Sequence, residues 1–524
     1  MHKNLFKMTF VCLFLALAMT AQAQSWQFVG SRAMGMGGAG VATAYGPDAQ
    51  YWNPAGLAQE DDLNETGLLI NVGADMQATK NTLEGVRNLT EMADQYKNLE
   101  NAISGGQKAN AENINTIFKG LNDISKLINA NSGVLVNANG GLGLKIKNFS
   151  VSARAIGTGA ITPVVDTKNI QFNTGTGLTL STVTAAPSTA ANTDAANTLK
   201  NAIEKYGILE ALNRLLGDLG YDSTQMANAI INAMDENGAS PDVVSQTVNT
   251  VVENLGGASE ILNQYAQATG SYKDNETLAM ADVATFGEMS LGYGQKIIPG
   301  LKLGANVKVL TGYTAQSGVM ILKDNEDIGD ILDKAYDNKK SNTNLGIDLG
   351  ALVNFSELLD KEIFLNPQVG LTAKNINGPK FNRPDVPAGM DPAIVAHWNH
   401  DKYQLKPQVR AGVAVNPIKN MTVAVDLDLT ENDTLVKGLD SRQLGLGMEI
   451  NVFNRPKFHI PLRVGYNTNL ASSDVSDFIT AGIGLNMLHF YLELAGAIST
   501  DTTKVEGNTI PNSAAVSLSL GFLF

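Results

Sequence analysis

Few residues in this sequence have the types and spacing that enzyme or metal chemistry requires. His397 and His400 form an H-x-x-H pair with Asp391 and Asp401 nearby, a weak metal signal that is more often made by solvated loop residues. Residues 324–330 read D-N-E-D-I-G-D and could bind calcium, but they lack the spacing of an EF-hand loop. No serine lies in a G-x-S-x-G motif. We therefore predict a protein that is not an enzyme and that has no cofactor and no metal site.

A glycine-rich segment near the N-terminus is the other candidate for chemistry. Gly35, Gly37 and Gly40 match G-x-G-x-x-G, but no buried strand precedes them and no βαβ unit follows, so we reject a dinucleotide site. The glycines more plausibly allow close backbone packing. Asn53, Pro54 and Ala55 begin a turn in which proline restricts Asn53 to extended geometry. We expect residues 24–63 to form a compact plug inside a lumen, and we call this segment the hatch.

The first 23 residues predict export. Lys3 and Lys7 form a basic n-region, residues 8–19 are apolar, and Ala21-Gln22-Ala23 is an A-x-A cleavage site. This predicts a signal peptide over residues 1–23 and export through the Sec pathway. The only cysteine, Cys12, lies inside that segment, so the mature chain would have no disulfide and no thiol nucleophile.

Composition narrows the class of protein further. The formal charge of −13 becomes −15 when Lys3 and Lys7 are removed, which argues against a nucleic-acid-binding surface. Outside the signal peptide no run of 18 apolar residues exists, so no helical membrane span is expected. Yet the chain is 44% hydrophobic, has 51 glycines and is only 17% charged. This combination fits a barrel whose strands are apolar on one side only.

The C-terminal residues 512–524 carry the clearest strand pattern. Val516, Leu518, Leu520, Phe522 and Phe524 alternate with serine and glycine, so one face of an extended strand is apolar and the other is small and polar. A final strand of this kind, in an exported protein, indicates an outer-membrane β-barrel, although a soluble sandwich could end the same way.

Similar alternation predicts about fourteen antiparallel strands, with short connections after even-numbered strands and long ones after odd-numbered strands. This is the arrangement of an outer-membrane barrel, and it places both termini on the periplasmic side. The expected strands begin near Thr66, Gly133, Phe149, Val283, Leu301, Asn342, Phe364, Leu405, Met421, Ser441, His459, Val475, His489 and Asn512.

Two long connections have helical periodicity instead. We expect helical insertions at about residues 80–131 and 190–275, including a helix that Ser240 caps and Gly256 ends. They could form a cap that packs on itself above the barrel, or a face that binds a partner or ligand. The sequence does not separate these alternatives.

If the apolar faces meet lipid, charged side chains of both signs face the lumen. They could form a salt-bridged wall that holds the barrel and hatch rigid, or a lining that selects what passes. Arg32 is a candidate contact from the hatch to Asp426 or Asp428. The expected lumen residues are Lys145, Arg154, Glu288, Lys302, Lys308, Asp348, Lys374, Arg410, Asp426, Asp428, Glu449, Arg463 and Glu493. Aromatic residues near strand ends fit interfacial girdles. They are Tyr293, Tyr313, Phe355, Phe364, Tyr466, Phe478 and Phe490.

The hatch residues also resemble a known family. Residues 32–42, 48–49 and 53–58 are similar to the N-terminal hatch of FadL-type outer-membrane transporters, including its N-P-A motif. The glycine-rich sequence of this segment is more similar to the subgroup of conjugal transfer TraF-like and PorV-like outer-membrane proteins. Residues 425–430, 462–466 and 481–485 also resemble that subgroup. The resemblance covers the expected helical insertions poorly.

This resemblance implies a fourteen-stranded barrel, plugged by a hatch, that passes hydrophobic molecules through a side opening. Because FadL-type proteins are thought to release ligands through a kinked third strand, Gly157 and Gly159 are candidates for a lateral gate. The alternative is ordinary strand glycine against a close neighbour.

Together these inferences predict a signal peptide, a hatch and an all-β transmembrane barrel over residues 64–524, in the outer membrane of a Gram-negative-type bacterium. The leading function is passive transport of hydrophobic small molecules such as long-chain fatty acids. The alternative is a structural or docking barrel for a secretion, conjugation or surface-attachment machine. The expected partners are outer-membrane lipid, a hydrophobic ligand and a secretion or conjugation protein, with no nucleic acid. A soluble periplasmic β-protein is a third possibility.

Overall fold

A computed structural model describes most of the chain. It covers residues 25–59, 66–80, 82, 110–128, 132–170, 180–216, 219–270, 274–320, 335, 337–385, 395, 398, 401–453, 455, 458–505 and 508–523. The predicted signal peptide, His397, His400, Asp391 and residues 324–330 lie outside these ranges.

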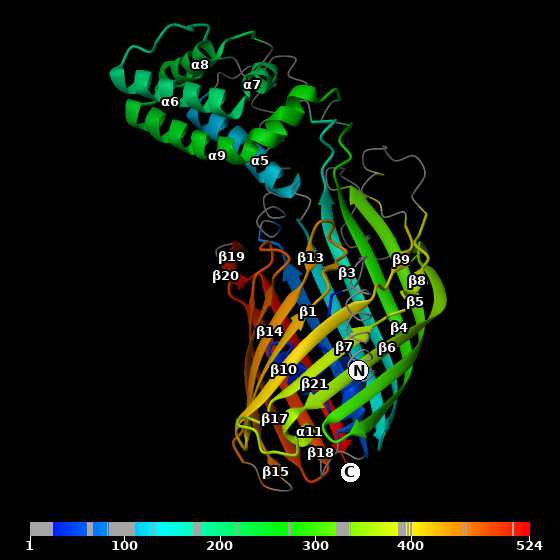
Figure 1. The fold of residues 1–524 in the computed structure, drawn as a ribbon. Helices are drawn as coiled ribbons and strands as arrows, with labels where there is room; N and C mark the ends of the chain where they lie inside the picture. The colour runs from blue at the N-terminus through cyan, green and yellow to red at the C-terminus, as the bar shows by residue number, and fades with distance from the viewer. Residues whose placement is uncertain are drawn as a thin grey trace, which may run out of the picture.

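Fourteen described strands form one closed antiparallel barrel, as predicted (Figure 1). Each pairs with the next barrel strand along the chain, and the barrel closes where β1 pairs with β21, with Gly67 opposite Leu523. The barrel strands are β1 (Thr66–Ala78), β2 (Val134–Ile146), β3 (Phe149–Val164), β4 (Leu278–Ile298), β5 (Leu301–Met320), β6 (Lys340–Asn354), β7 (Gln368–Lys374), β10 (Gln408–Ile418), β11 (Met421–Asp428), β14 (Gln443–Asn451), β16 (Pro461–Asn469), β17 (Phe478–Met487), β18 (Phe490–Ser499) and β21 (Ser513–Leu523).

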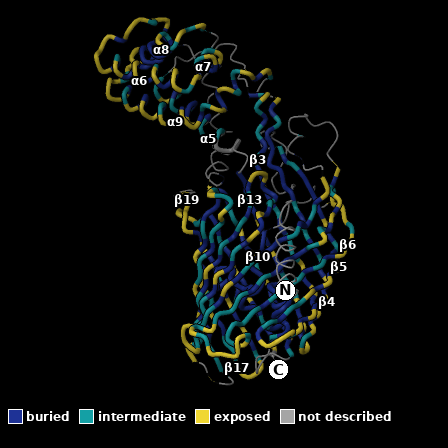
Figure 2. Tube along the Cα trace, in the orientation of Figure 1, coloured by how far each residue is buried: buried dark blue, intermediate teal, exposed yellow. Residues whose placement is uncertain are grey.

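The two faces of the wall differ as the alternation predicts. In β21 the side chains of Val516, Leu518 and Phe522 are exposed on the outer face, whereas Ser517 and Ser519 are buried in the lumen. Because strand side chains alternate between faces, the outside of the barrel is apolar and the inside polar. Figure 2 shows the same contrast between a buried interior and exposed positions on the outer wall and rims.

Most strands begin within three residues of the predicted position. β4 is the main exception, because it begins at Leu278 and not near Val283. Leu278, Ala279, Met280 and Ala281 are all buried, so no alternation marks this end of the strand. Its neighbours include Trp398 and Val164, which cover the strand beyond the barrel rim.

The connections are short at one end of the barrel and long at the other. Lys147–Asn148 joins β2 to β3, and two residues also join β4 to β5, β10 to β11 and β17 to β18. The connection from β6 to β7 is longer and contains α11 (Phe355–Leu358). Smaller elements in the other connections are β8 (Lys380–Phe381), β9 (Tyr403–Gln404), β12 (Asn432–Asp433), β13 (Asp440–Ser441), β15 (Phe458–His459), β19 (Thr502–Val505) and β20 (Asn508–Pro511).

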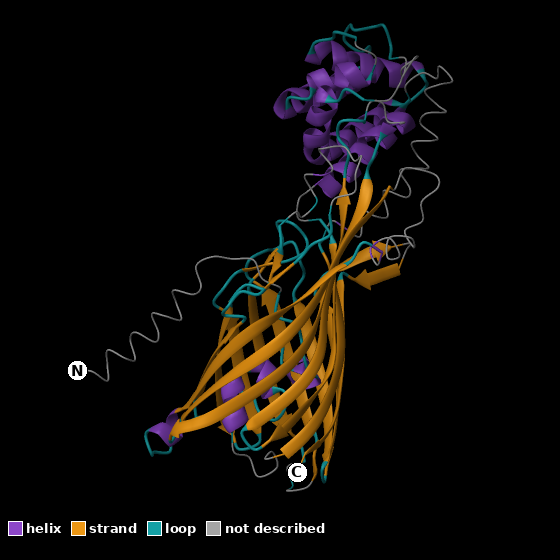
Figure 3. Ribbon diagram, turned by 90° about the vertical axis from the view of Figure 1, so that its right-hand side faces the viewer, coloured by secondary structure: helices purple, strands orange, loops and turns teal. Residues whose placement is uncertain are grey.

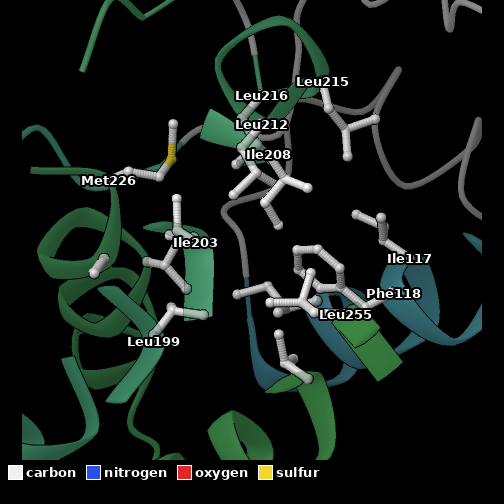
Figure 4. Packing of buried hydrophobic residues seen from close by; sticks show 14 of the residues in the cluster. Ile117, Phe118, Leu199, Ile203, Ile208, Leu212, Leu215, Leu216, Met226 and Leu255 are labelled. Carbon is white, nitrogen blue, oxygen red and sulfur yellow. The ribbon is translucent and has the colours of Figure 1, made fainter. Parts of the chain in front are cut away.

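A helical head stands beyond the long-loop end (Figure 1). The β1–β2 connection supplies one helix and the β3–β4 connection supplies the others. They are α5 (Ala111–Ile128), α6 (Ala190–Tyr206), α7 (Leu209–Leu215), α8 (Ser223–Glu236) and α9 (Pro241–Gln267). Buried side chains from all five form one hydrophobic core, including Phe118, Ile203, Leu212 and Leu255 (Figure 4).

The helix that Ser240 caps does not end at Gly256, so that prediction is wrong. α9 continues to Gln267, and a Cβ at Gly257 would lie less than 3.0 Å from the Asn122 side chain of α5. Gly257 leaves room for the close approach of α5, although glycine is unfavourable in a helix interior. In the described chain, no helix is long and apolar enough to cross a membrane.

Candidate functional site: the hatch and the barrel lumen

Residues 25–59 of the hatch lie inside the barrel (Figure 3). The segment contains α2 (Ser31–Gly35), α3 (Ala49–Trp52) and a 3₁₀ turn, η1 (Pro54–Ala58). Asn53 organises the turn, since its side-chain oxygen accepts from the Ala55 amide at 3.1 Å and Pro54 occupies the first position of the helix. Its amide nitrogen donates to the Ala351 carbonyl of β6 at 3.0 Å. The N-P-A motif therefore joins the hatch to the wall.

Three wall glycines form the surface on which this motif sits. Gly294 of β4 is opposite Gly304 of β5, and Gly304 is opposite Gly350 of β6. A Cβ at any of the three would lie less than 3.0 Å from atoms of residues 53–58. Because no side chain fits between them, hatch backbone packs directly on wall backbone.

A second glycine contact holds the other part of the hatch. Gly37 has φ +65°, and a Cβ there would overlap the Leu446 and Tyr466 carbonyl groups. Facing it, Gly447 is opposite Gly465 in the wall, and both leave room for the backbone of Met36 and Gly37. Gly35 lies against Gly482, and Gly40 lies against the Trp52 ring. The G-x-G-x-x-G pattern thus serves packing.

An ion network joins the hatch to β14, β16 and β18. Arg32 Nε lies 2.9 Å from Glu449 Oε2, and Arg463 Nε lies 2.6 Å from the same oxygen. Arg463 also pairs with Glu493. Since removing one partner from a buried pair leaves an uncompensated charge, these side chains must be present together.

The predicted partners of Arg32, Asp426 and Asp428, are wrong. Asp426 Oδ2 accepts from the backbone amides of Gly40 and Val41 at 2.8 and 2.7 Å. Asp428 pairs with Arg410 and accepts from the Gln443 amide at 2.9 Å. Several carboxylates face the lumen, and the sequence does not show how the hatch is rotated inside it. The partner of Arg32 could therefore not be chosen among them from the sequence.

Cations of the wall surround aromatic side chains of the hatch. Lys374 Nζ lies 3.0 Å from the centroid of the Tyr51 ring and 3.7 Å from that of Trp26. The Arg410 guanidinium carbon lies 4.6 Å from the Trp26 centroid, and Trp26 stacks on Trp52. Cation–π contacts of this kind strengthen when they are removed from water.

The remaining predicted lumen residues are also buried. Lys308 Nζ lies 2.9 Å from Asp348 and 3.6 Å from Glu288, which in turn lies 3.5 Å from Arg154. Lys302 is placed apart from this group, near the short-turn rim, with Glu357 at 3.9 Å. Lys145 is buried as well. The arrangement is one of paired charges and not of a single-sign lining.

One titratable hatch group has a shifted protonation equilibrium. Burial raises the pKa of the Asp48 carboxyl to about 6, against the opposing effects of Arg154 and of the hydrogen bond from Asn71. The Asn71 amide donates to Asp48 Oδ1 at 2.6 Å.

The predicted kink at Gly157 and Gly159 is absent. β3 pairs without a register shift with β2 on one side and β4 on the other through both positions. The two glycines alternate with buried Thr158 and Ala160, so they lie on the outer face. Gln27 of the hatch donates to the Gly157 carbonyl at 2.9 Å from inside. Glycine in this strand therefore does not interrupt the wall.

The pairing instead stops early at β7, which the sequence analysis missed. β7 pairs with β6 only from Leu349 to Asn354. No described strand pairs with that side of β6 at the residues that precede Leu349. Ile376 and Asn377 lie there, with the Ile376 amide donating to the Ile347 carbonyl at 3.0 Å and the Asn377 side chain to the Leu345 carbonyl at 2.8 Å. We call this place the β6 notch.

Folded-in loops pack against the wall at the long-loop end of the lumen. Phe381 and Leu405 pack on Phe286 and Leu310 of the wall, in a cluster that also contains Tyr403 and Val436. Arg383 Nη1 lies 2.7 Å from Asp282 Oδ2 and fixes the same segment to β4.

The cavities found between described residues of the lumen are small. One cavity of about 40 Å³ lies between Arg32, Tyr45 and Tyr491, and another of about 40 Å³ lies between Glu288, Lys308 and Lys374. A third, near Arg154, has about 10 Å³. Such volumes hold a few water molecules, whereas small-molecule sites usually need roughly 300 Å³ or more. Within the described ranges, no group of three or more His, Cys, Asp or Glu side chains could hold a metal ion.

The aromatic part of the hatch was also missed by the sequence analysis. Trp26 and Trp52 are two of only three tryptophans in the chain, and Tyr51 adjoins Trp52. Their concentration near the N-terminus was the available signal. Phe478, expected in an interfacial girdle, is instead buried against Phe28 of the hatch.

Comparisons with known proteins give one family and several structures. The family model described as "F plasmid transfer operon, TraF, protein" matches residues 50–428. No curated protein matches. Similar structures include the Ralstonia pickettii toluene transporter TbuX, at 9% identity and TM-score 0.40, covering 94% of this chain and 98% of that one. A Pseudomonas aeruginosa FadL homologue has 10% identity and TM-score 0.38, covering 97% and 99%. The Pseudomonas putida toluene transporter TodX has 9% identity and TM-score 0.39, covering 96% and 98%.

Proposed function

The chain belongs to the F plasmid transfer operon TraF protein family, and from this premise we propose that it is a closed outer-membrane barrel that docks other components of a conjugation or secretion assembly. The observation that carries the proposal is the filled lumen. The hatch packs backbone to backbone on wall glycines and is tied to the wall by Arg32, Glu449 and Arg463.

The outer membrane is the proposed location. The wall exposes apolar side chains on its outer face, such as Met289, Val464 and Ile479. Water would disfavour so large an apolar surface, whereas hydrocarbon accepts it. With the short connections on the periplasmic side, the head lies outside the cell. The same location requires export, and we propose that the predicted signal peptide directs it.

The helical head supports docking. Its core draws on helices from two separate connections and, among the described residues, contains no side chain of a barrel strand, so barrel closure does not need it. A folded unit that is dispensable to the wall is suited to contact with another protein.

The direct test is to isolate the full chain from its host membranes in mild detergent and to measure its mass on native gels. We expect a complex heavier than the barrel alone, and no lipophilic molecule bound in stoichiometric amount by mass spectrometry. A chain that migrates alone and carries a bound lipophile would contradict docking.

Passage of hydrophobic small molecules is the second candidate. The observation that favours it is the β6 notch, because Asn375, which directly precedes Ile376, borders a cavity that apolar Phe286 and Leu310 line together with charged side chains. Transport would require the hatch or loops to move. Tying Leu345 to Asn377 through an engineered disulfide should then abolish uptake of a hydrophobic dye, while unchanged uptake would exclude this route. Bulky residues at Gly157 and Gly159 should leave uptake unchanged if the notch is the exit.

A further inference from the structure

Two connections at the short-turn end are longer than two residues: residues 452–460 join β14 to β16, and a still longer connection joins β6 to β7. β2–β3, β4–β5, β10–β11 and β17–β18 are each joined by two residues, but thirteen residues, Phe355 to Pro367, join β6 to β7. The extra residues are not needed to reverse the chain, since two suffice elsewhere in the same wall. We call this connection the β6–β7 knob. Figure 3 shows its helix, α11, projecting sideways from the short-turn end of the barrel.

The knob exposes large apolar side chains. Phe364 is 85% exposed, the highest value among the exposed large hydrophobic side chains of the described chain, and Leu359 is 61% exposed. Asp360, Lys361 and Glu362 lie between them and are also exposed. The knob thus combines two apolar anchors with a net negative charge.

The knob is bonded to the barrel on both sides. Glu357 accepts from the Gly300 amide at 3.2 Å and lies within 4 Å of Lys296 and Lys302, while Asn354 caps α11. On the other side, the Asn416 amide donates to the Leu365 carbonyl at 2.7 Å. The exposed residues therefore lie between two points at which the connection is hydrogen-bonded to neighbouring strands or turns.

The backbone of the knob is also unusual. Asp360, Leu365 and Asn366 have φ of 47°, 68° and 42°, and they are half of the six non-glycine residues with positive φ in the described chain. Leucine is rarely found in the left-handed region, and such conformations persist where the surrounding structure imposes them, often at functional sites.

We propose that the β6–β7 knob is a docking site for a protein on the periplasmic side, which receives Phe364 and Leu359 in an apolar pocket rimmed by basic side chains. The proposal rests on the docking function above. Aromatic anchors on preorganised supports are typical of the residues that dominate interface energy. The basic rim follows from Asp360 and Glu362, which lie between the two anchors and form no ion pair with a described cation.

The competing occupant is the membrane, since an exposed phenylalanine at a barrel rim could belong to an interfacial girdle. Spin labels distinguish the two, because the predicted mature chain has no cysteine. A label at Phe364→Cys in nanodiscs should collide with a water-soluble nickel chelate as often as one at Lys361→Cys. A label at Val464→Cys, on the outer wall within β16, should collide mainly with oxygen dissolved in lipid. Lipid-like accessibility at residue 364 would overturn the proposal.

Docking itself is tested on native gels with the full chain in its host. We expect the double variant Leu359→Ser with Phe364→Ser to reduce the heavy complex at least tenfold. Leu488→Ser, which changes an equally exposed leucine in another short turn, should leave it intact. Heat-modifiable mobility of all variants verifies that the barrel folds.

The charge requirement is tested by a zero-length carbodiimide cross-link. It should join Asp360 or Glu362 to a lysine of the partner, and the Asp360→Lys with Glu362→Lys variant should lose the complex. If the double serine variant keeps the complex, the knob is not the docking site although docking elsewhere stands. If the wild-type chain forms no complex, both the knob and the proposed function are wrong.

Discussion

Gly304 of β5 packs directly on Pro54 of the hatch, so closely that a Cβ at position 304 would lie less than 3.0 Å from the proline. The contact lies within a row in which Gly294, Gly304 and Gly350 face one another across three strands. Hatch and wall are therefore complementary at the level of the backbone, which leaves no layer of side chains to repack.

The first prediction concerns this row. Gly304→Ala should displace the N-P-A turn, because the added methyl group meets backbone and not a flexible side chain. We expect the hatch to become sensitive to protease and the heat-modifiable transition to fall in temperature. Gly159→Ala is the control, since its Cβ would be 3.7 Å from its nearest neighbour. Equal behaviour of the two variants would contradict the account.

The second prediction concerns the ion network. Arg463→Gln should destabilise the hatch by about 3–5 kcal/mol, because it leaves Glu449 and Glu493 buried with less compensation. Hydrogen exchange of the hatch amides, measured at increasing denaturant concentration, gives the midpoint at which their protection is lost. A shift of this midpoint measures the effect. Lys340→Gln removes a rim ion pair with exposed Asp385 and should change little. A midpoint for Arg463→Gln as high as for this control would exclude a stabilising network.

The third prediction concerns pH. Because the pKa of Asp48 in the folded protein is about 6, above the ordinary value of 3.8, the neutral carboxyl is favoured by folding. Its contribution to stability is present below about pH 4 and is lost as pH rises through 6. Asp48→Asn keeps a neutral side chain, so it should reduce the loss of hatch stability between pH 4 and pH 7. An unchanged pH dependence in urea unfolding would show that Asp48 does not titrate in this range.

The fourth prediction separates head from barrel. Leu212→Ala leaves a cavity among fully buried residues of the head and should cost the head about 2–5 kcal/mol. Limited proteolysis should then cut the helices at lower temperature while the barrel keeps its heat-modifiable mobility. Loss of the barrel together with the head would contradict two independent cores.

The barrel was well predicted because the two faces of each strand meet different surroundings, apolar outside the wall and polar in the lumen, so that apolar and polar residues alternate along the sequence. Val516 and Leu518 meet the outside and Ser517 the lumen, and nothing else in the fold obscures that pattern. The prediction from alternation failed at Leu278 to Ala281, because other segments cover both faces of the strand there and alternation disappears. The early end of β7 has no local signal, since it depends on where Ile376 and Asn377 cross β6.

The lumen was predictable in composition but not in pairing. Alternation identified Glu449, Arg463 and Asp426 as inward-facing, yet only the rotation of the hatch decides that Arg32 meets Glu449 and that Asp426 meets the Gly40 amide. The aromatic contacts of Lys374 depend on the same rotation. The gate expected at Gly157 came from a resemblance, and small outward-facing residues in a regular strand do not by themselves bend it.

The central claim is that the hatch closes the barrel, and conductance across a planar lipid bilayer tests it most directly. The full mature chain should insert and give no steady current, whereas a variant lacking residues 25–59 should give open channels. A steady single-channel current from the full chain, with the hatch intact, would contradict the account.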